Sequence, residues 1–222
     1  LGSDRVLTIY NAPSKRFFKR PYLLRRSSTL GIKTICHDGS LNFNKGLKLI
    51  VESLLLLHNQ KVKFRFKLIG DVRGTEELDW LSKIFRENPE FHKIFHITGW
   101  VDYENVGQHL KDCDVGISAS LYKPNSVVSA PNKIFNYMYY GLPFVMPDFF
   151  LLKEQICFVS PCGIYAEYTS KDYADSLFIL LTDQELYCEM KKNCSKLSNL
   201  SFNWENQILP LLNVIQQIKM DH

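Results

Sequence analysis

The chain has 222 residues, of which 45% are hydrophobic and 23% charged, the balance of a globular protein long enough to bury one large core. Its net charge of +4 is local, because six cations lie among residues 11–30 without an acid, and the other 21 basic residues face 23 acidic ones. Without an apolar run of about 18 residues or a signal-peptide pattern, the sequence argues against the membrane-spanning and secreted classes.

The chain begins with an apolar run over residues 6–10, which ends at the turn signal Asn-Ala-Pro. A basic segment follows, and its cations are Lys15, Arg16, Lys19, Arg20, Arg25 and Arg26. Three interpretations are open: a solvated linker, a patch that attracts an anionic membrane surface, or a nucleic-acid-binding segment. Aromatic residues interleave with the charges, which suits the last two. We favour the linker and expect no nucleic acid partner.

From residue 33 on, strand and helix patterns alternate. Strands are predicted over residues 33–37, 64–69, 94–98, 115–118, 143–146 and 163–166. Helical periodicity is found over residues 47–57, 76–86, 103–111, 131–140, 172–181, 184–198 and 204–218, the last interrupted or kinked near Pro210. This alternation predicts an α/β fold, a Rossmann-like doubly wound parallel sheet with helices on both faces. In such a sheet a ligand binds beyond the carboxyl ends of the strands.

The loop over residues 39–46 is the first candidate site at that edge. It links a strand to a helix, its glycines allow close backbone approach, and Lys45 lies where the helix starts. A phosphate would suit such a loop. The Walker order Gly-Lys-Ser/Thr is absent, so an ordinary solvated turn with a surface lysine is the alternative.

The stronger candidate is the segment over residues 129–145. Pro131 suits the first turn of a helix, and Ser129 is a candidate N-cap. The first-turn amides would then point toward the carboxyl edge of the sheet, where Lys133 and Asn136, three residues apart, can reach one ligand. A buried helix whose aromatic stripe is core is a compatible alternative.

This segment, Ser-Ala-Pro-Asn-Lys-Ile-Phe-Asn-Tyr-Met-Tyr-Tyr-Gly-Leu-Pro-Phe-Val, resembles the signature Ser-Pro-Asn-Lys-Leu-Phe-Glu-Tyr-Met…Gly-Leu-Pro-Val of group 1 (family 4) glycosyltransferases. Other segments are similar to that family in the same order along the chain. They are residues 9–13, 39–46, 66–71, 96–101, 112–118, 182–185 and 202–205. The resemblance covers nearly the whole chain.

The resemblance implies the C-terminal, nucleotide-sugar-binding half of a GT-B fold, preceded in the whole protein by an N-terminal acceptor domain. It divides the chain into an interdomain strand and basic linker (1–30), a Rossmann-like domain (31–200) and a C-terminal crossover helix (201–222). It also implies a retaining hexosyltransferase of polysaccharide or glycolipid synthesis. The donor would be a nucleotide-diphosphate sugar, without a metal or other cofactor.

On this mapping the donor contacts are Gly39, Ser40, Lys45, Gly99, Trp100, Val101, Ser129, Pro131, Asn132, Lys133 and Asn136. Lys45 and Asn136 are the catalytic candidates. Together with Lys133 and the helix amides, Lys45 would stabilise the departing nucleotide diphosphate. We expect the isolated chain to bind nucleotide without transferring sugar.

Two departures from the family pattern weaken the mapped site. The family's basic residue after the loop glycine falls at Ser40, and its paired glutamates fall at Val128 and Asn136. The second glutamate normally holds the ribose hydroxyls, which Asn136 can bind only without charge. A charged hydrogen bond contributes about 1.5–3 kcal/mol and a neutral one about 1 kcal/mol. A catalytically inactive nucleotide-binding or partner-binding module of the same fold is therefore the alternative.

The six cysteines and six histidines show no metal-ligand spacing, which indicates reduced thiols and structural imidazoles rather than a metal site. Among the histidines, His37 lies near the candidate phosphate loop. We expect a cytoplasmic protein, with peripheral contact to the inner membrane face through residues 15–26 as the open addition.

Overall fold

The computed structural model describes residues 6–16, 31–121, 123–127, 129–149 and 160–220. A six-stranded parallel sheet forms its centre, in the order β3-β2-β1-β4-β5-β6. The strands are β1 (Lys33–Asp38), β2 (Phe64–Ile69), β3 (Phe95–Ile97), β4 (Val115–Ile117), β5 (Phe144–Pro147) and β6 (Gly163–Ala166). This order reverses between β1 and β4, as in a doubly wound nucleotide-binding fold. The predicted Rossmann-like parallel sheet is confirmed.

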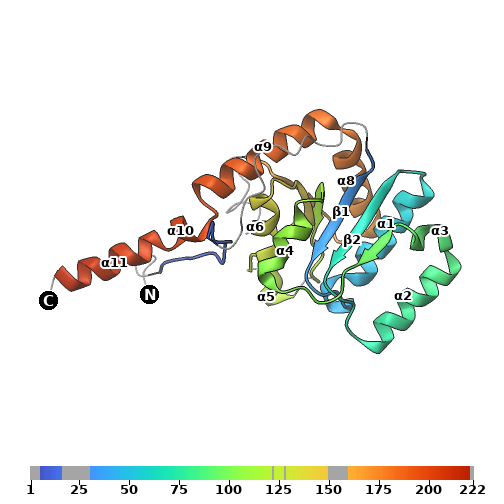
Figure 1. Ribbon diagram of the computed structural model, residues 1–222, viewed down its shortest axis with the longest axis horizontal. Coiled ribbons are helices and arrows are strands. Elements are labelled where there is room, and N and C mark those ends of the chain that lie inside the picture. Colours follow the sequence, from blue (N-terminus) through green and yellow to red (C-terminus); the bar gives the residue numbers. More distant parts are fainter. Residues whose placement is uncertain (1–5, 17–30, 122, 128, 150–159, 221–222) are drawn as a thin grey trace.

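Helices connect the strands and cover both faces of the sheet (Figure 1). They are the 3₁₀ turn η2 (Phe43–Lys45) and the helices α1 (Leu47–Asn59), α2 (Thr75–Glu87), α3 (Pro89–His92), α4 (Tyr103–Leu110), α5 (Pro124–Val127), α6 (Asn132–Tyr139), α8 (Ser170–Thr182), α9 (Gln184–Leu200), α10 (Trp204–Gln207) and α11 (Leu209–Met220). The sequence did not predict α3 and α5. Each has 4 residues, too few to show a helical period.

One face of the sheet is covered mainly by α1, α2 and α8. The predicted stripe of α1, which includes Leu47, Ile50, Leu54 and Leu57, is buried against this face. In β2 the burial alternates, because Phe64, Phe66 and Leu68 point into this core. The periodicities read from the sequence therefore correspond to real core contacts.

The opposite face is covered by α4, α6 and the carboxyl-terminal part of α9. Every residue of α6 from Ile134 to Tyr139 is buried, and Tyr137 packs 6.2 Å from Phe144 of β5, measured between ring centroids. The alternative that this aromatic helix is core is therefore correct. Because only the first turn of α6 is less buried, any ligand must approach it from that end.

Residues 6–14, where the sequence predicts an interdomain strand, run without regular secondary structure and pack against the end of the chain. The Tyr10 ring lies 5.5 Å from Phe135 and 5.7 Å from Phe202. Trp204 N donates to Pro13 O at 3.1 Å. Residues 10–14 therefore lie beside residues 202–207, and α11 extends beyond this contact (Figure 1).

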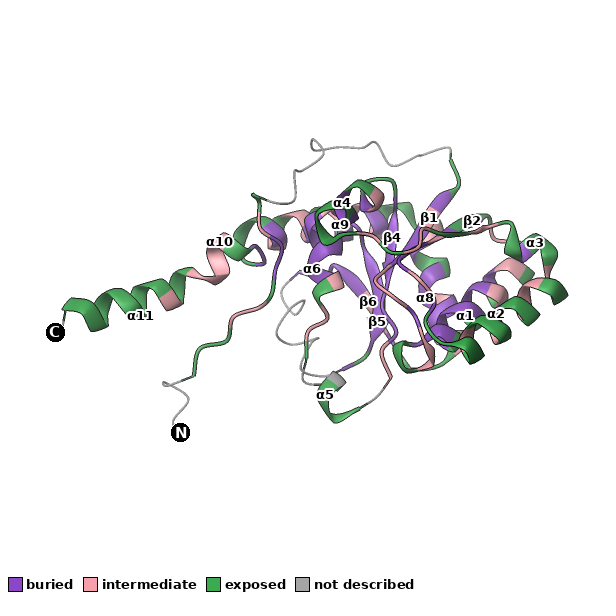
Figure 2. Ribbon diagram, turned by 60° about the horizontal axis from the view of Figure 1, so that its bottom comes forward, coloured by how far each residue is buried: buried purple, intermediate pink, exposed green. Residues whose placement is uncertain are grey.

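The last helical segment is interrupted, as predicted. α10 ends at Gln207 and α11 begins at Leu209, so Pro210 occupies the second position of α11, where a missing N–H is tolerated. Beyond this break α11 contains no buried residue, and Figure 2 shows it extending away from the core. No helix in the described ranges combines the length and apolarity that a membrane crossing requires.

Candidate functional site

The carboxyl end of β1 leads directly into the predicted phosphate loop. Gly39 has a φ of 99°, a left-handed backbone conformation that favours glycine. The Asn42 side chain caps η2 by accepting from Lys45 N at 2.9 Å. The exposed Lys45 ammonium donates to Ser40 Oγ at 3.1 Å. Ser40 and Lys45, two of the three predicted donor contacts in this loop, therefore lie together at its surface.

At Gly46 the phosphate loop packs closely against the chain that follows β4. The φ of Gly46 is 81°, and a Cβ on this residue would lie 1.8 Å from the carbonyl oxygen of Ala119. From the same neighbouring loop, Lys123 Nζ donates to Asn44 Oδ1 at 3.1 Å. Two loops that the sequence placed at the carboxyl edge are thus side by side, and only glycine fits where they meet.

The start of α6 differs from the prediction by one residue. Its first helical residue is Asn132, and Pro131 is the N-cap, with a φ of −64° and a ψ of 129°. Ser129 is exposed and does not cap the helix, which corrects its predicted role. The proline disfavours helical conformation in the residue before it, so the helix cannot start at Ser129. No side chain caps α6, which leaves its first-turn amides available to an anion.

Two side chains of α6 tie the helix to the ends of β1 and β4. Asn136 Nδ2 donates to Asp38 Oδ2 at 2.7 Å. The Tyr137 hydroxyl accepts from Asp38 N at 3.0 Å and donates to Ile117 O at 3.1 Å. The Tyr137 ring fills the space above Gly116, where a Cβ would lie 2.4 Å from a ring atom. The tip of α6 is therefore held beside the phosphate loop.

Two ammonium groups and one carboxylate gather at this point. Burial lowers the pKa of Lys133 to about 8, a shift that Lys45 increases and Asp38 opposes. Burial raises the pKa of Asp38, whereas the hydrogen bond from Asn136 and the charge of Lys133 lower it. Within the described ranges, no carboxylate lies within 4.0 Å of the Lys133 ammonium. A bound anion would relieve the repulsion between the two lysines.

His37 lies beneath this cluster, with 1% of its surface exposed. Its Nδ1–H donates to Ile117 O at 3.0 Å, and its buried Nε2 has no hydrogen-bond partner among the described atoms. Burial lowers the pKa of His37 well below its ordinary value, and the charges of Lys133 and Lys45 add to that effect. The imidazole is therefore neutral near pH 7.

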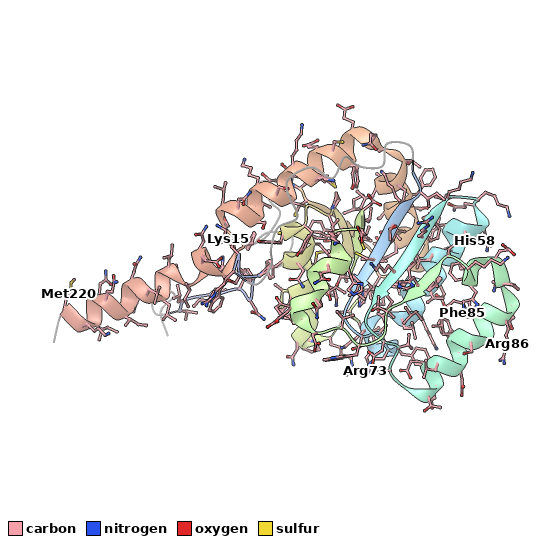
Figure 3. All side chains as sticks on the ribbon, viewed as in Figure 1. Lys15, His58, Arg73, Phe85, Arg86 and Met220 are labelled. Atoms are coloured by element: carbon pink, nitrogen blue, oxygen red, sulfur yellow. The ribbon has the colours of Figure 1, made fainter. Side chains whose placement is uncertain are left out.

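The loop after β3 carries the residues predicted to frame the base. Gly99 has a φ of 74°, and Trp100 is 73% exposed. The Arg73 guanidinium lies 5.8 Å from the centroid of the Trp100 ring. Figure 3 shows Arg73 beyond the carboxyl end of β2. An exposed indole supported by a guanidinium offers a flat surface for stacking. Val101, by contrast, packs against the core.

The predicted residues fall into two groups. Ser40, Lys45, Lys133 and Asn136 meet at the ends of β1 and β4, whereas residues 99–101 follow β3, two strands away from β1. Val128 lies outside the described residues. The sequence analysis missed Asp38, although a polar residue that closes a buried strand just before Gly39 was a usable signal. The ligand-binding roles themselves stay predictions.

The described cysteines form no recognisable metal site. Within the described ranges, Cys36, Cys113, Cys188 and Cys194 are free thiols, and no group of three or more His, Cys, Asp or Glu side chains could hold a metal ion. Cys157 lies outside those ranges.

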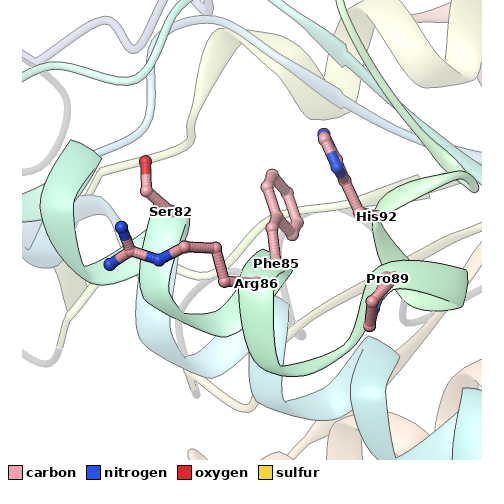
Figure 4. A pocket seen from close by; sticks show the side chains of 5 residues that line it. All are labelled: Ser82, Phe85, Arg86, Pro89 and His92. Carbon is pink, nitrogen blue, oxygen red and sulfur yellow. The ribbon is translucent and has the colours of Figure 1, made fainter.

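Two surface hollows lie away from the carboxyl edge. The first, of about 430 Å³, is lined by residues of α2 and α3 (Figure 4), namely Ser82, Phe85, Arg86, Pro89 and His92. The second, of about 880 Å³, includes Arg65, Lys67 and His96 on the face of β2 and β3. Neither contains a predicted site residue.

Comparisons with known proteins agree with this arrangement. Residues 32–183 match the family model described as Glycosyl transferases group 1. Chitobiosyldiphosphodolichol beta-mannosyltransferase of Candida glabrata is 24% identical over an alignment of 237 positions, which covers 95% of this chain and 51% of that protein. The chain therefore spans about half the length of the curated relative it matches.

Solved structures share the fold at low sequence identity. The C-terminal domain of the group 1 glycosyl transferase LpcC from Francisella tularensis has a TM-score of 0.64 and 16% identity, over 86% of this chain and 95% of that one. Sucrose-phosphate synthase from Thermosynechococcus elongatus has a TM-score of 0.72 and 16% identity, over 95% and 52%. Anabaena HepE in complex with UDP has a TM-score of 0.71 and 15% identity, over 94% and 57%.

Proposed function

Because this chain belongs to the group 1 glycosyl transferases, we propose that it is the donor-binding half of an enzyme that transfers a sugar from a nucleotide-diphosphate sugar to an acceptor. The acceptor would belong to polysaccharide or glycolipid synthesis. The name of the Candida glabrata relative is that of a mannosyltransferase, and a solved neighbour is described in complex with UDP, which supports this choice.

The observation that carries the proposal is the meeting of Lys45, Lys133 and the uncapped start of α6 at one edge of the sheet. The charge of Lys45 lowers the pKa of Lys133 there, and among the described residues Asp38 is the only carboxylate that raises it. Helix amides and ammonium groups are the usual partners of a diphosphate. The arrangement is therefore short of negative charge, which a nucleotide diphosphate supplies.

In the reaction, these groups would act through electrostatics. As the bond between the sugar and the diphosphate breaks, negative charge grows on the diphosphate oxygens. Lys45, Lys133 and the amides of Asn132 and Lys133 would stabilise that charge. Ser40 would add a hydroxyl hydrogen bond. Trp100 and its neighbours would hold the base. These groups need neither a metal nor another cofactor, and we propose retention of anomeric configuration on the strength of the family resemblance.

The rest of the active site would come from an N-terminal acceptor domain. α11 exposes Leu209, Leu212, Val214, Ile215 and Ile218, an apolar surface suited to packing against such a domain. The chain spans about half of its curated relative, which agrees with this picture. We therefore propose that the chain alone binds the donor but does not turn it over.

We further propose a cytoplasmic enzyme in which residues 15–26 form a solvated linker, with contact to the inner membrane face as the second candidate role of this segment. Most of this segment lies outside the described residues, and the support comes from its cations and aromatic side chains alone. Sedimentation of the chain with vesicles that contain anionic lipid would test the contact. Binding that is equal for neutral vesicles would contradict it.

The donor site is tested by thermal unfolding with UDP, GDP and ADP. A ligand present at about 100 times its Kd adds about 2.7 kcal/mol to the free energy of unfolding and, for a domain of this size, raises Tm by about 5–10 °C. Lys45→Ala and Lys133→Ala should reduce the shift. Lys83→Ala, which removes an exposed lysine of α2, is the matched control and should preserve it.

The absence of a shift with every nucleotide diphosphate, in a folded sample, would contradict the donor site. Turnover of a protein that contains both halves separates an active transferase from an inactive binding module of the same fold.

A further inference from the structure

The carboxylate of Asp38 has hydrogen-bonding capacity that the protein leaves unused. Asn136 Nδ2 donates to Oδ2 at 2.7 Å, and the described residues supply no donor to Oδ1. The side chain is only partly exposed, so it cannot rely on water as a surface carboxylate does. A partly buried carboxylate with so few partners is unfavourable unless a further donor reaches it.

Two buried neighbours show the same shortage of donors. Asn136 is 2% exposed, and its Oδ1 has no hydrogen-bond partner among the described atoms. Nε2 of His37 is also buried without a partner. Three acceptors therefore surround the end of β1, and Asp38 is the one that reaches the surface.

Cations lie near the same carboxylate, and the charge of Lys133 lowers its pKa. Lys133 is one turn before Asn136 on α6, and Lys45 follows Asp38 in the phosphate loop. A ligand that fits this site must present negative charge to the lysines and hydroxyl hydrogens to the carboxylate of Asp38. A nucleotide sugar has both, a diphosphate flanked by the hydroxyl pairs of the ribose and of the sugar.

We propose that Asp38 is a specificity-determining residue of the donor site, whose carboxylate accepts hydrogen bonds from a vicinal hydroxyl pair of the nucleotide sugar while Lys45 and Lys133 bind the diphosphate. Asn136 holds the carboxylate in place through its amide. This inference rests on the proposed donor site and assigns a role to a residue for which the sequence analysis predicted none.

The test measures ratios of affinity by calorimetry. UDP and GDP are compared with their 2′-deoxy and 3′-deoxy forms, which probes the ribose, and with UDP-glucose and GDP-mannose, which probes the sugar. The native chain should bind a ligand that keeps the recognised hydroxyl pair about tenfold more tightly than one that lacks it. Asp38→Asn should reduce that ratio to about twofold, because an amide is a weaker acceptor.

Ratios are required because Asp38 also opposes the charge of any diphosphate. Removing the carboxylate changes the affinity for all these ligands by the same factor, because each of them contains a diphosphate. Only the loss of a hydroxyl contact changes the ratio of affinities between two ligands. A loss in the ribose ratio identifies the ribose, and a loss in the sugar ratio identifies the transferred sugar. Either result supports the role of Asp38.

Two further variants keep the test independent of folding. The exchange Asp38→Asn with Asn136→Asp returns a carboxylate to the pair and should recover part of the ratio. Asp79→Asn, an exposed carboxylate of α2, should leave it unchanged. If Asp38→Asn changes the affinity for every ligand by the same factor, the ribose ratio and the sugar ratio stay as in the native chain. That result would overturn the inference about Asp38 but would still agree with the proposed donor site. A native chain that binds none of the ligands would overturn both.

Discussion

Lys133 is the residue whose charge depends most on what occupies the candidate site. Its pKa is about 8, lowered by burial and by Lys45. A bound diphosphate places negative charge beside the ammonium and raises that pKa, so binding takes up a proton above pH 8. We expect the affinity for UDP or GDP to fall about tenfold between pH 7 and pH 9, as the free lysine loses its proton. Calorimetry in buffers of different ionisation enthalpy measures the affinity and the proton uptake together.

Lys133→Arg is the matched control for this prediction, because arginine keeps its charge throughout the range. Its affinity for the diphosphate should not change with pH, and binding should take up no proton above pH 8. Lys83→Arg, far from the site on α2, should keep the profile of the native chain. Proton uptake that persists unchanged in Lys133→Arg would show that another group is responsible.

At the scale of elements, the phosphate loop and the end of β4 are held in contact by Gly46. Gly46 and Gly39 both have positive φ values, 81° and 99°, so alanine strains the backbone at either position. Only at Gly46 would the added Cβ also collide with Ala119 O; at Gly39 it would meet no atom within 4 Å. Gly46→Ala should therefore lower the free energy of unfolding by about 1–3 kcal/mol more than Gly39→Ala.

Urea denaturation of both variants checks this difference. Because Gly46→Ala must also push the phosphate loop away from the chain after β4, it should displace Lys45 and weaken UDP or GDP binding as well. Equal stability losses in the two variants would mean that the loop adapts freely and that the close approach does not shape the site.

At the scale of the whole molecule, α11 is attached to the domain without being part of its core. It has no buried residue, and a helix of its 12 residues is marginal when isolated. Figures 2 and 3 show it projecting from the domain, with Met220 at its far end. In the chain alone we expect the amides of α11 to exchange with solvent much faster than those of α9, which buries Tyr187, Met190 and Cys194.

Hydrogen exchange followed by mass spectrometry resolves the two helices. In a protein that also contains the proposed N-terminal domain, α11 should become protected, because its apolar side chains would then be covered. Protection of α11 in the chain alone that matches α9 would contradict this view of the molecule.

Local patterns in the sequence were sufficient for most of the fold. The stripe of Leu47, Ile50, Leu54 and Leu57 predicted α1, and the alternation over 64–69 predicted β2. Both depend on side chains that are near neighbours along the chain, so their period is visible without coordinates. The cap of α6 was predicted wrongly at Ser129, since the proline that delays the helix start was assigned to the first helical turn instead of the N-cap.

The sequence by itself determined the strand–helix order, the sheet edge where a ligand is expected and the membership of Lys45, Lys133 and Asn136 in one candidate site. Only the tertiary structure decided that Asp38 joins them, through a hydrogen bond to a residue 98 positions away. It also decided the lowered pKa of Lys133. Hydrogen bonds and charge interactions depend on distance and burial in space, and neither is encoded in the spacing of residues along a chain.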